Sequence, residues 1–277
     1  MVSKIINLYR QLKVIVHINN HLGGMIDSSG VIDGDAYIKA KNGRYFFSQK
    51  SPYYLKRLHF LLRKDLRKKI PADLMLTLFD INLRYMSRKN QELHLKEGKY
   101  LELKKGDVVF EIGAYIGFHA IKMSELVSKD GKIIAVEAVP DNFRLLVKNI
   151  EVNKINNIIP IHLAVWEKKG VIPFNINQNQ ENSAYADVVG SKSKMDISCD
   201  TIDNIYHQLK LDKIDFVRVQ TNGAELEALK GMTKVLKMDP KLLVAVPYKN
   251  KDVIQQILIK EGYSTVFTGH SIFAEKA

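Results

Sequence analysis

Two acidic residues and two glycines stand where an α/β protein would bind a nucleoside cofactor. Glu111 lies in an apolar run that ends at Gly113, and Gly117 follows four positions later. Gly113 permits a tight turn or a close backbone approach, and Gly117 lets a helix start close to the strand. The spacing is GxxxG rather than the three-glycine dinucleotide pattern, and the charge of Glu111 would repel a pyrophosphate. We therefore expect a ligand with a positive charge and no phosphate.

A second acid, Glu137, ends the next apolar run. A carboxylate at this position can accept hydrogen bonds from both ribose hydroxyls of a nucleoside. Together with Glu111, Gly113 and Gly117, it predicts a site for S-adenosylmethionine. The alternative is an ordinary βαβ unit whose glycine-rich turn is structural.

Short β-branched runs alternate with helical patterns from residue 104 onward. The predicted strands span 108–112, 133–137, 158–165, 216–220 and 242–246. The predicted helices span 118–128, 142–153, 224–236 and 253–261, residues 175–182 form a polar loop, and a hairpin joins 264–267 to 271–274. Strands and helices that alternate in this way predict βαβ units and a mainly parallel, doubly wound sheet, so the fold class is α/β.

From about residue 101 to the end, the chain resembles the FkbM-family methyltransferases, a group mostly assigned to O-methylation of sugars, polyketides and other natural products. The resemblance is carried by GDVVFEIGAYIG (106–117), VEAVPDNF (136–143), AV (164–165), TIDN (201–204) and GAELEALKG (223–231). It implies a Rossmann-like, seven-stranded class I methyltransferase sheet that binds S-adenosylmethionine.

The same resemblance implies a role for each matching residue. Glu111 would lie near the amino acid part of the cofactor, the loop 113–117 beneath it, Glu137 on its ribose, and the 164–165 pair beside its adenine. The implied cofactor-binding residues are Glu111, Gly113, Ala114, Tyr115, Gly117, Glu137, Ala164 and Val165.

The chain departs from the family pattern after its fourth predicted strand. The family usually reads IDVEGAE there, whereas residues 219–225 read VQTNGAE and replace two acids with Gln220 and Asn222. The fifth strand commonly ends in EVH but here ends in Ala245-Val246-Pro247. Both amides can orient a hydroxyl by hydrogen bonds, but neither can act as a general base near pH 7. The candidate catalytic residues are Gln220, Asn222 and Glu225.

Three interpretations of these substitutions stay open. Alignment and hydrogen bonding alone could suffice for an acceptor that is already nucleophilic. A replacement base could come from Glu225, His119, Tyr115 or the N-terminal region, although Glu225 also has a structural explanation at the start of a helix. Finally, the domain could bind the cofactor without catalysing transfer.

The composition separates the chain into two parts. With 46% hydrophobic and 26% charged residues, its 277 residues are typical of a soluble globular protein. Residues 1–100 hold 19 Lys and Arg against 8 Asp and Glu, or +11 of the net +12, which leaves +1 for residues 101–277. We therefore predict a basic α+β extension, 1–100, that caps the substrate side, and a cofactor-binding methyltransferase domain, 101–277.

Within the extension, we expect a helix over the first 25 residues or so, two strands within 36–47 around an Asn42-Gly43 hairpin turn, and helices between 52 and 86. Seven basic residues lie between Lys56 and Lys69, interleaved with apolar ones. They form either a solvated face or a surface for phosphates, anionic lipid headgroups or an acidic substrate.

These features favour an O-methyltransferase that acts on a small molecule or a glycan, and the basic extension makes an anionic acceptor the better choice. The alternatives are a nucleic-acid methyltransferase and a non-catalytic cofactor-binding protein. No Cys/His spacing indicates a metal site. The single cysteine, Cys199, cannot form an internal disulfide, no signal peptide is evident, and we expect a cytoplasmic protein. The oligomeric state is not predicted.

Overall fold

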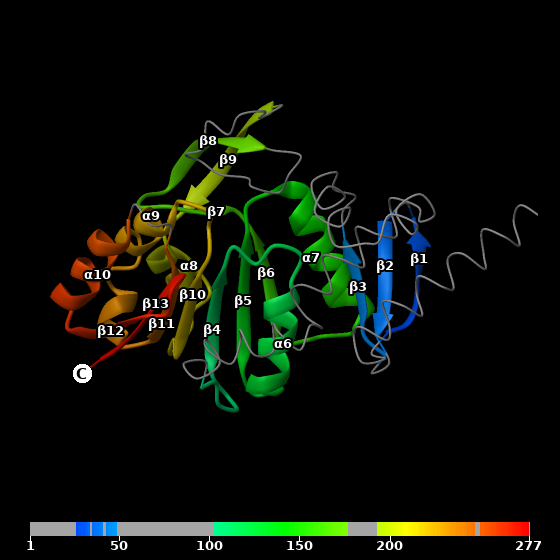
Figure 1. Ribbon diagram of the computed structural model, residues 1–277, viewed down its shortest axis with the longest axis horizontal. Helices are drawn as coiled ribbons and strands as arrows, with labels where there is room; N and C mark the ends of the chain where they lie inside the picture. Colours follow the sequence, from blue (N-terminus) through cyan, green and yellow to red (C-terminus); the bar gives the residue numbers. More distant parts are fainter. Residues whose placement is uncertain are drawn as a thin grey trace, which may run out of the picture. The chain divides into compact units, whose positions relative to one another are not determined.

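The structure is a computed structural model that describes residues 26–33, 35–40, 43–48, 102–176, 193–246 and 250–276 (Figure 1). The chain divides into two compact units, residues 1–95 and 96–277. The predicted helices before residue 26 and between 52 and 86, including the basic stretch from Lys56 to Lys69, lie outside the described residues. No helix in the described ranges is long and apolar enough to cross a membrane.

The described part of the first unit is an antiparallel three-stranded sheet. Its strands are β1 (Ile26–Ile32), β2 (Asp35–Ala40) and β3 (Tyr45–Ser48), in that order. Strands β2 and β3 confirm the predicted hairpin, and β1 was not predicted. The predicted two-residue turn at Asn42-Gly43 is wrong. Lys39 pairs with Tyr45, which leaves an odd number of residues between them, whereas a two-residue turn requires an even number. Gly43, with φ 85°, supplies the left-handed conformation that a longer loop needs.

The second unit is built on a seven-stranded sheet whose spatial order is β12-β13-β11-β10-β4-β5-β6. Strands β4 (Val108–Ile112), β5 (Lys132–Glu137), β6 (Ile158–His162), β10 (Phe216–Val219) and β11 (Lys241–Ala245) pair in parallel. The closing hairpin of β12 (Tyr263–Phe267) and β13 (Ser271–Lys276) adds β13 antiparallel to β11. This topology confirms the predicted Rossmann-like α/β fold.

The central strands form because most of their residues are apolar and both faces of the sheet are covered. Every residue of β4 and of β10 is buried, as expected for strands covered by helices on both sides. On one face, alternate strand residues such as Phe110, Val217 and Val244 pack with residues from the helices near the C-terminal end of the chain. These helices are α8 (Ile202–Gln208), α9 (Glu225–Lys230), the 3-10 helix η2 (Val235–Met238) and α10 (Lys251–Lys260).

Helices α6 (Phe118–Val127) and α7 (Pro140–Val152) contact β4, β5 and β6, and they lie apart from α8 to α10 in Figure 1. Helix α7 starts at Pro140, whose fixed φ suits the first turn. The chain therefore leaves the sheet toward a helix after β4, β5 and β10. These crossovers place three loops at one edge of the sheet.

Two predicted elements are each divided. The strand predicted over 158–165 is wrong as one element, because β6 ends at His162 and the short β7 (Ala164–Val165) joins a different sheet. The helix predicted over 224–236 is also interrupted. At Gly231 the chain passes so close to Trp166 that an added Cβ would lie 2.2 Å from the Trp166 carbonyl oxygen. Helix α9 ends just before this contact, and η2 follows.

A long hairpin that the sequence did not predict extends from the second unit. Strands β8 (Gly170–Ile176) and β9 (Ser193–Asp200) pair antiparallel, and β7 pairs with β9. The predicted polar loop over 175–182 is wrong at its start, because β8 continues to Ile176, and the rest of that loop lies outside the described residues. Phe174 and Ile197 on this hairpin pack with Val139, which follows β5.

Candidate functional site

The loop after β4 approaches both neighbouring strands. The backbone N–H groups of Gly113 and Ala114 both donate to the carbonyl oxygen of Val136 on β5, at 2.9 Å. On the other side, a Cβ added to Gly113 would lie only 2.0 Å from the carbonyl oxygen of Gln220. Gly113 also has φ 81°, so both its position and its conformation require glycine.

The second glycine precedes helix α6 as predicted, but its close neighbour is helix α7 rather than the strand. Gly117 has φ 94°, and a Cβ there would lie 2.7 Å from Cδ1 of Leu146 on α7. Its carbonyl oxygen accepts the N–H of Ile121, the first hydrogen bond of the helix. The candidate base His119 lies in the first turn of this helix.

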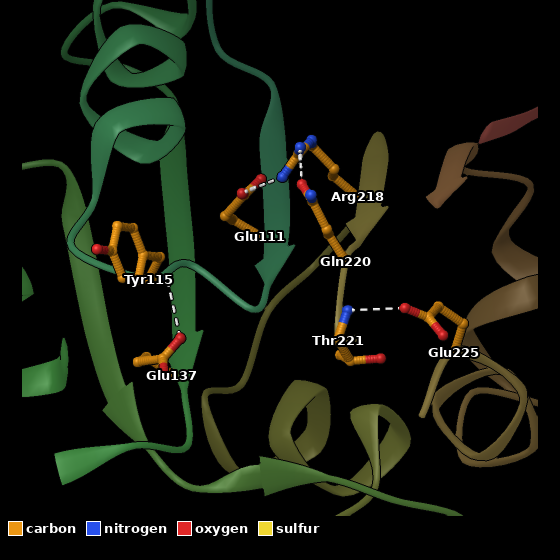
Figure 2. Close-up of polar contacts among 7 residues, drawn as sticks. All are labelled: Glu111, Tyr115, Glu137, Arg218, Gln220, Thr221 and Glu225. Carbon is orange, nitrogen blue, oxygen red and sulfur yellow. Dashed lines mark hydrogen bonds and ion pairs between the residues drawn. The ribbon is translucent and has the colours of Figure 1, made fainter. Parts of the chain in front are cut away.

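Glu137 holds the β4 loop across the edge of the sheet (Figure 2). Its Oε2 accepts the backbone N–H of Tyr115 at 2.8 Å, and its Oε1 accepts the N–H of Val139 at 3.0 Å and Nδ2 of Asn142 at 3.2 Å. The side chain is only 6% exposed, and this burial raises the pKa of Glu137 although the three hydrogen bonds lower it. Tyr115 itself has φ 54°, an uncommon value for a residue other than glycine.

Glu111 has a partner that the sequence did not predict. It lies directly opposite Arg218 in the pairing of β4 with β10, and Nη1 of Arg218 donates to Oε1 of Glu111 at 2.6 Å. Nη2 of Arg218 donates to Oε1 of Gln220 (Figure 2). The signal that could have identified Arg218 is a single basic residue within the apolar run 216–220.

The loop after β10 is held by Glu225. This glutamate is 1% exposed, and its two carboxylate oxygens accept the N–H groups of Thr221 at 3.0 Å and Gly223 at 2.9 Å. Burial raises the pKa of Glu225, while these backbone hydrogen bonds lower it. Asn222 has φ 54° and Gly223 has φ 118°, so the loop turns back tightly between the two bonds.

Ala164 and Val165 lie in β7, where both side chains are buried. Val165 belongs to the main core and Ala164 to the cluster beneath the β8–β9 hairpin. The structure joins Gly113 to Gln220 and Tyr115 to Glu137 by direct contacts, whereas the 164–165 strand pairs with β9. The adenine assignment of these two residues therefore stays a prediction.

A comparison with known protein families decides what kind of domain this is. The model described as "Methyltransferase FkbM domain" matches residues 111–263, which include Glu111, Glu137, Gln220 and Glu225. The chain belongs to the FkbM methyltransferase domain family.

Individual relatives of this FkbM chain match it over shorter segments. The hexuronic acid methyltransferase AglP of Haloferax volcanii is 29% identical over 136 residues, which cover 49% of this chain and 54% of that protein. A protein-L-isoaspartate O-methyltransferase of Fervidobacterium nodosum is 45% identical over 60 residues, or 22% of this chain and 30% of that protein. The chain thus spans about half the length of the first relative and less of the second.

Among solved structures, an FkbM methyltransferase from Methylobacillus flagellatus KT is similar to this chain with a TM-score of 0.49 at 15% identity. The match covers 80% of this chain and 57% of that one.

The acidic side chains at this edge of the FkbM sheet are already hydrogen-bonded within the chain. Glu111, Glu137 and Glu225 each accept hydrogen bonds from nearby residues of the chain. Among the described residues, no group of three His, Cys, Asp or Glu side chains could hold a metal ion. The polar groups described at this edge are three carboxylates, the Gln220 amide, the Arg218 guanidinium and backbone N–H groups.

Proposed function

We propose that this chain is an S-adenosylmethionine-dependent O-methyltransferase that acts on a small molecule or a glycan with an anionic acceptor group. The observation that carries the proposal is the bond from Tyr115 N to Glu137 Oε2, which holds the glycine loop of β4 beside the acid that ends β5. Open α/β sheets bind ligands at this edge, where the loops of neighbouring strands separate. Membership of the FkbM family supports the choice of cofactor.

The residues at this edge fit the proposed cofactor. Among the described residues, Oε2 of Glu137 accepts one hydrogen bond, from Tyr115 N, and a carboxylate oxygen can accept two, so a ribose hydroxyl can donate there. At Gly113 and Gly117 the loop backbone carries no side chain and lies close to Gln220 and Leu146. When bound, S-adenosylmethionine supplies an electrophilic methyl group on a sulfonium.

The acceptor side favours an oxygen that is already nucleophilic. Gln220 and Asn222 are amides, and both oxygens of Glu225 hold its own loop, so these residues orient an acceptor rather than take its proton. Two relatives are named for acidic targets, a hexuronic acid and isoaspartate. The +11 charge of residues 1–100 would attract an anionic acceptor through its long-range field.

Calorimetry with S-adenosylhomocysteine tests cofactor binding, and methyl transfer from labelled S-adenosylmethionine tests catalysis. We expect saturable binding of one nucleoside per chain, and label transfer to oligosaccharides that contain hexuronic acid but not to their neutral counterparts. If the wild-type chain binds no nucleoside at millimolar concentration, the proposed function is wrong. If it binds the nucleoside but transfers no label to either class, the non-catalytic alternative is favoured.

The basic extension also favours a second function, methylation of nucleic acid. Contacts with phosphates release counterions, so affinity for RNA or DNA would fall steeply as salt rises. A salt titration of binding to both polymers distinguishes the two functions. Immeasurable affinity at low salt eliminates the nucleic-acid alternative.

A further inference from the structure

Arg218 connects strand β4 with the first residue after β10 through its forked guanidinium. Nη1 reaches Glu111 on β4, and Nη2 reaches the amide oxygen of Gln220, just after β10 (Figure 2). Glu111 is fully buried and Arg218 is 8% exposed, so the fork is held in a low-dielectric environment. A planar guanidinium with fixed donor directions orients both partners more strictly than a lysine could.

This contact determines what Gln220 can offer to a ligand. The donor from Arg218 requires the oxygen of the amide to face the guanidinium, so the NH₂ group is the part left for other partners. That nitrogen donates to no other described residue, and Gln220 is partly exposed, unlike its buried neighbours Arg218 and Val219. Gln220 is therefore a fixed hydrogen-bond donor at the carboxyl edge.

The local charge permits an anion beside this donor. Glu111 alone would repel an anion, but its ion pair with Arg218 makes the two side chains neutral together. The guanidinium also carries five N–H donors, of which these contacts use two. The site therefore offers N–H donors and carries no net negative charge. Such a site favours a ligand oxygen that accepts hydrogen bonds.

We propose that Gln220 binds a carboxylate of the ligand and that Arg218 is the positioning residue that turns the Gln220 amide toward it. The proposal rests on the proposed function and deepens it, because it names the group that the site recognises. Two carboxylates are available, that of the amino acid end of the cofactor and that of the methyl acceptor.

Methylation of a carboxylate acceptor would need no general base. One carboxylate oxygen forms a bond to the methyl carbon as the carbon–sulfur bond breaks. The sulfur keeps the electron pair of that bond and loses its positive charge, and no proton is transferred. A methyl ester and S-adenosylhomocysteine are the products, so a donor at Gln220 suffices to orient the nucleophile.

Calorimetry on the full chain separates the two sources of the carboxylate. The first arm compares S-adenosylhomocysteine with 5′-methylthioadenosine, which lacks the amino acid end. The second arm adds D-glucuronate, or neutral D-glucose, to the protein loaded with S-adenosylhomocysteine. The variants are Gln220→Glu, which replaces the donor with an acceptor, and Arg218→Lys, which keeps the charge beside Glu111 but loses the fork. Gln255→Glu on α10 makes the same change of charge away from the site.

If the carboxylate belongs to the cofactor, both variants weaken S-adenosylhomocysteine about tenfold and leave 5′-methylthioadenosine unchanged. If it belongs to the acceptor, cofactor affinity is unchanged and glucuronate affinity falls about tenfold, while glucose does not bind. In either case Arg218→Lys has no further effect in the Gln220→Glu background, because Arg218 acts through Gln220.

The subsite is wrong if wild type binds the nucleosides and both variants bind S-adenosylhomocysteine, 5′-methylthioadenosine and D-glucuronate within twofold of wild type and of Gln255→Glu, or if cofactor affinity is unchanged and wild type binds no D-glucuronate. Either result would leave the proposed function intact. Loss of nucleoside binding by wild type itself would instead remove the proposed function, and the subsite with it.

Discussion

The loops that follow β4 and β10 leave the same edge of the sheet, and a buried glutamate holds each of them by accepting backbone N–H groups. In the β4 loop, the glutamate is Glu137, which lies 22 residues further along the chain on a neighbouring strand. In the β10 loop, it is Glu225, which lies only four residues from one donor and two from the other. The first loop is thus held by tertiary structure and the second by its own sequence.

This difference separates the expected roles of the two loops. The β4 loop keeps its shape only when β5 is in place, so a ligand that contacts Glu137 is coupled to the packing of the sheet. The β10 loop is a local turn, and its contact with the rest of the site passes through Gln220 to Arg218 and Gly113. The following predictions test this contrast.

The largest loss of stability is expected at the ion pair of Glu111 and Arg218, which connects β4 with β10. Arg218→Met leaves Glu111 buried without its counter-charge, and we expect the free energy of unfolding to fall by about 3–5 kcal/mol. The double variant Glu111→Gln/Arg218→Met removes both charges and recovers most of this loss. Urea unfolding measures both quantities, and equal losses in the single and double variants would contradict a dominant ion pair.

Next in size is the contact between the loop backbones. Gly113→Ala combines a left-handed φ with a Cβ that meets the Gln220 carbonyl oxygen, and we expect a loss of about 2–4 kcal/mol in stability. Gly269→Ala is the matched control, because Gly269 has φ 95° with nothing within 4 Å of an added Cβ. Thermal unfolding should show a clearly larger shift for Gly113→Ala, and equal shifts would mean that the close approach is relieved at little cost.

The two glutamates should differ in their effect on the cofactor. Glu137→Ala removes a charge-assisted hydrogen-bond partner for the ribose. It also removes the acceptor of the Tyr115 N–H, so we expect S-adenosylhomocysteine to bind about 1.5–3 kcal/mol more weakly. Glu225→Ala alters only the β10 loop and should change the dissociation constant much less. An unchanged dissociation constant in Glu137→Ala would refute the ribose assignment.

The smallest effect concerns pH. Burial raises the pKa of Glu225 above the ordinary value of 4.5, so folding favours the protonated carboxyl. Its contribution to stability is therefore largest below pH 4.5 and declines as the pH rises through the interval up to the raised pKa. Glu225→Gln removes this dependence, and the stability of wild type relative to the variant should fall across that interval. Urea unfolding at a series of pH values would show a flat difference if the pKa were not raised.

The sequence predicted the sheet better than the connections around it. Continuous apolar runs such as 108–112 became buried strands because parallel strands are covered on both faces. The hairpin of β8 and β9 was missed although Met195, Ile197 and Cys199 alternate with polar residues along β9, and part of its apolar face packs on Val139, which is distant in sequence. The helix over 224–236 was predicted too long, since periodicity does not report the close approach of Gly231 to Trp166.

The same limit applies to the site. Residue types and spacing identified Gly113, Gly117 and Glu137, because a glycine turn after a strand and an acid after the next strand are local signals. The partner of Glu111 could not be identified in this way. The family resemblance implies that Glu111 lies near the amino acid part of the cofactor, and the structure adds that its Oε1 accepts a hydrogen bond from Arg218, a residue 107 positions away.

By itself, the sequence determined the parallel strands of the main sheet and the helices that follow β4, β5 and β10, the glycine turn, the positions of the acids and the family. These properties depend on hydrophobic periodicity and on backbone conformations that single residues permit. Only the tertiary structure decided how the acids are used. The register of β4 with β10 places Glu111 opposite Arg218, and the crossover after β4 brings Tyr115 to Glu137. Hydrogen bonds act over about 3 Å, so their partners are set by strand pairing rather than by distance along the chain.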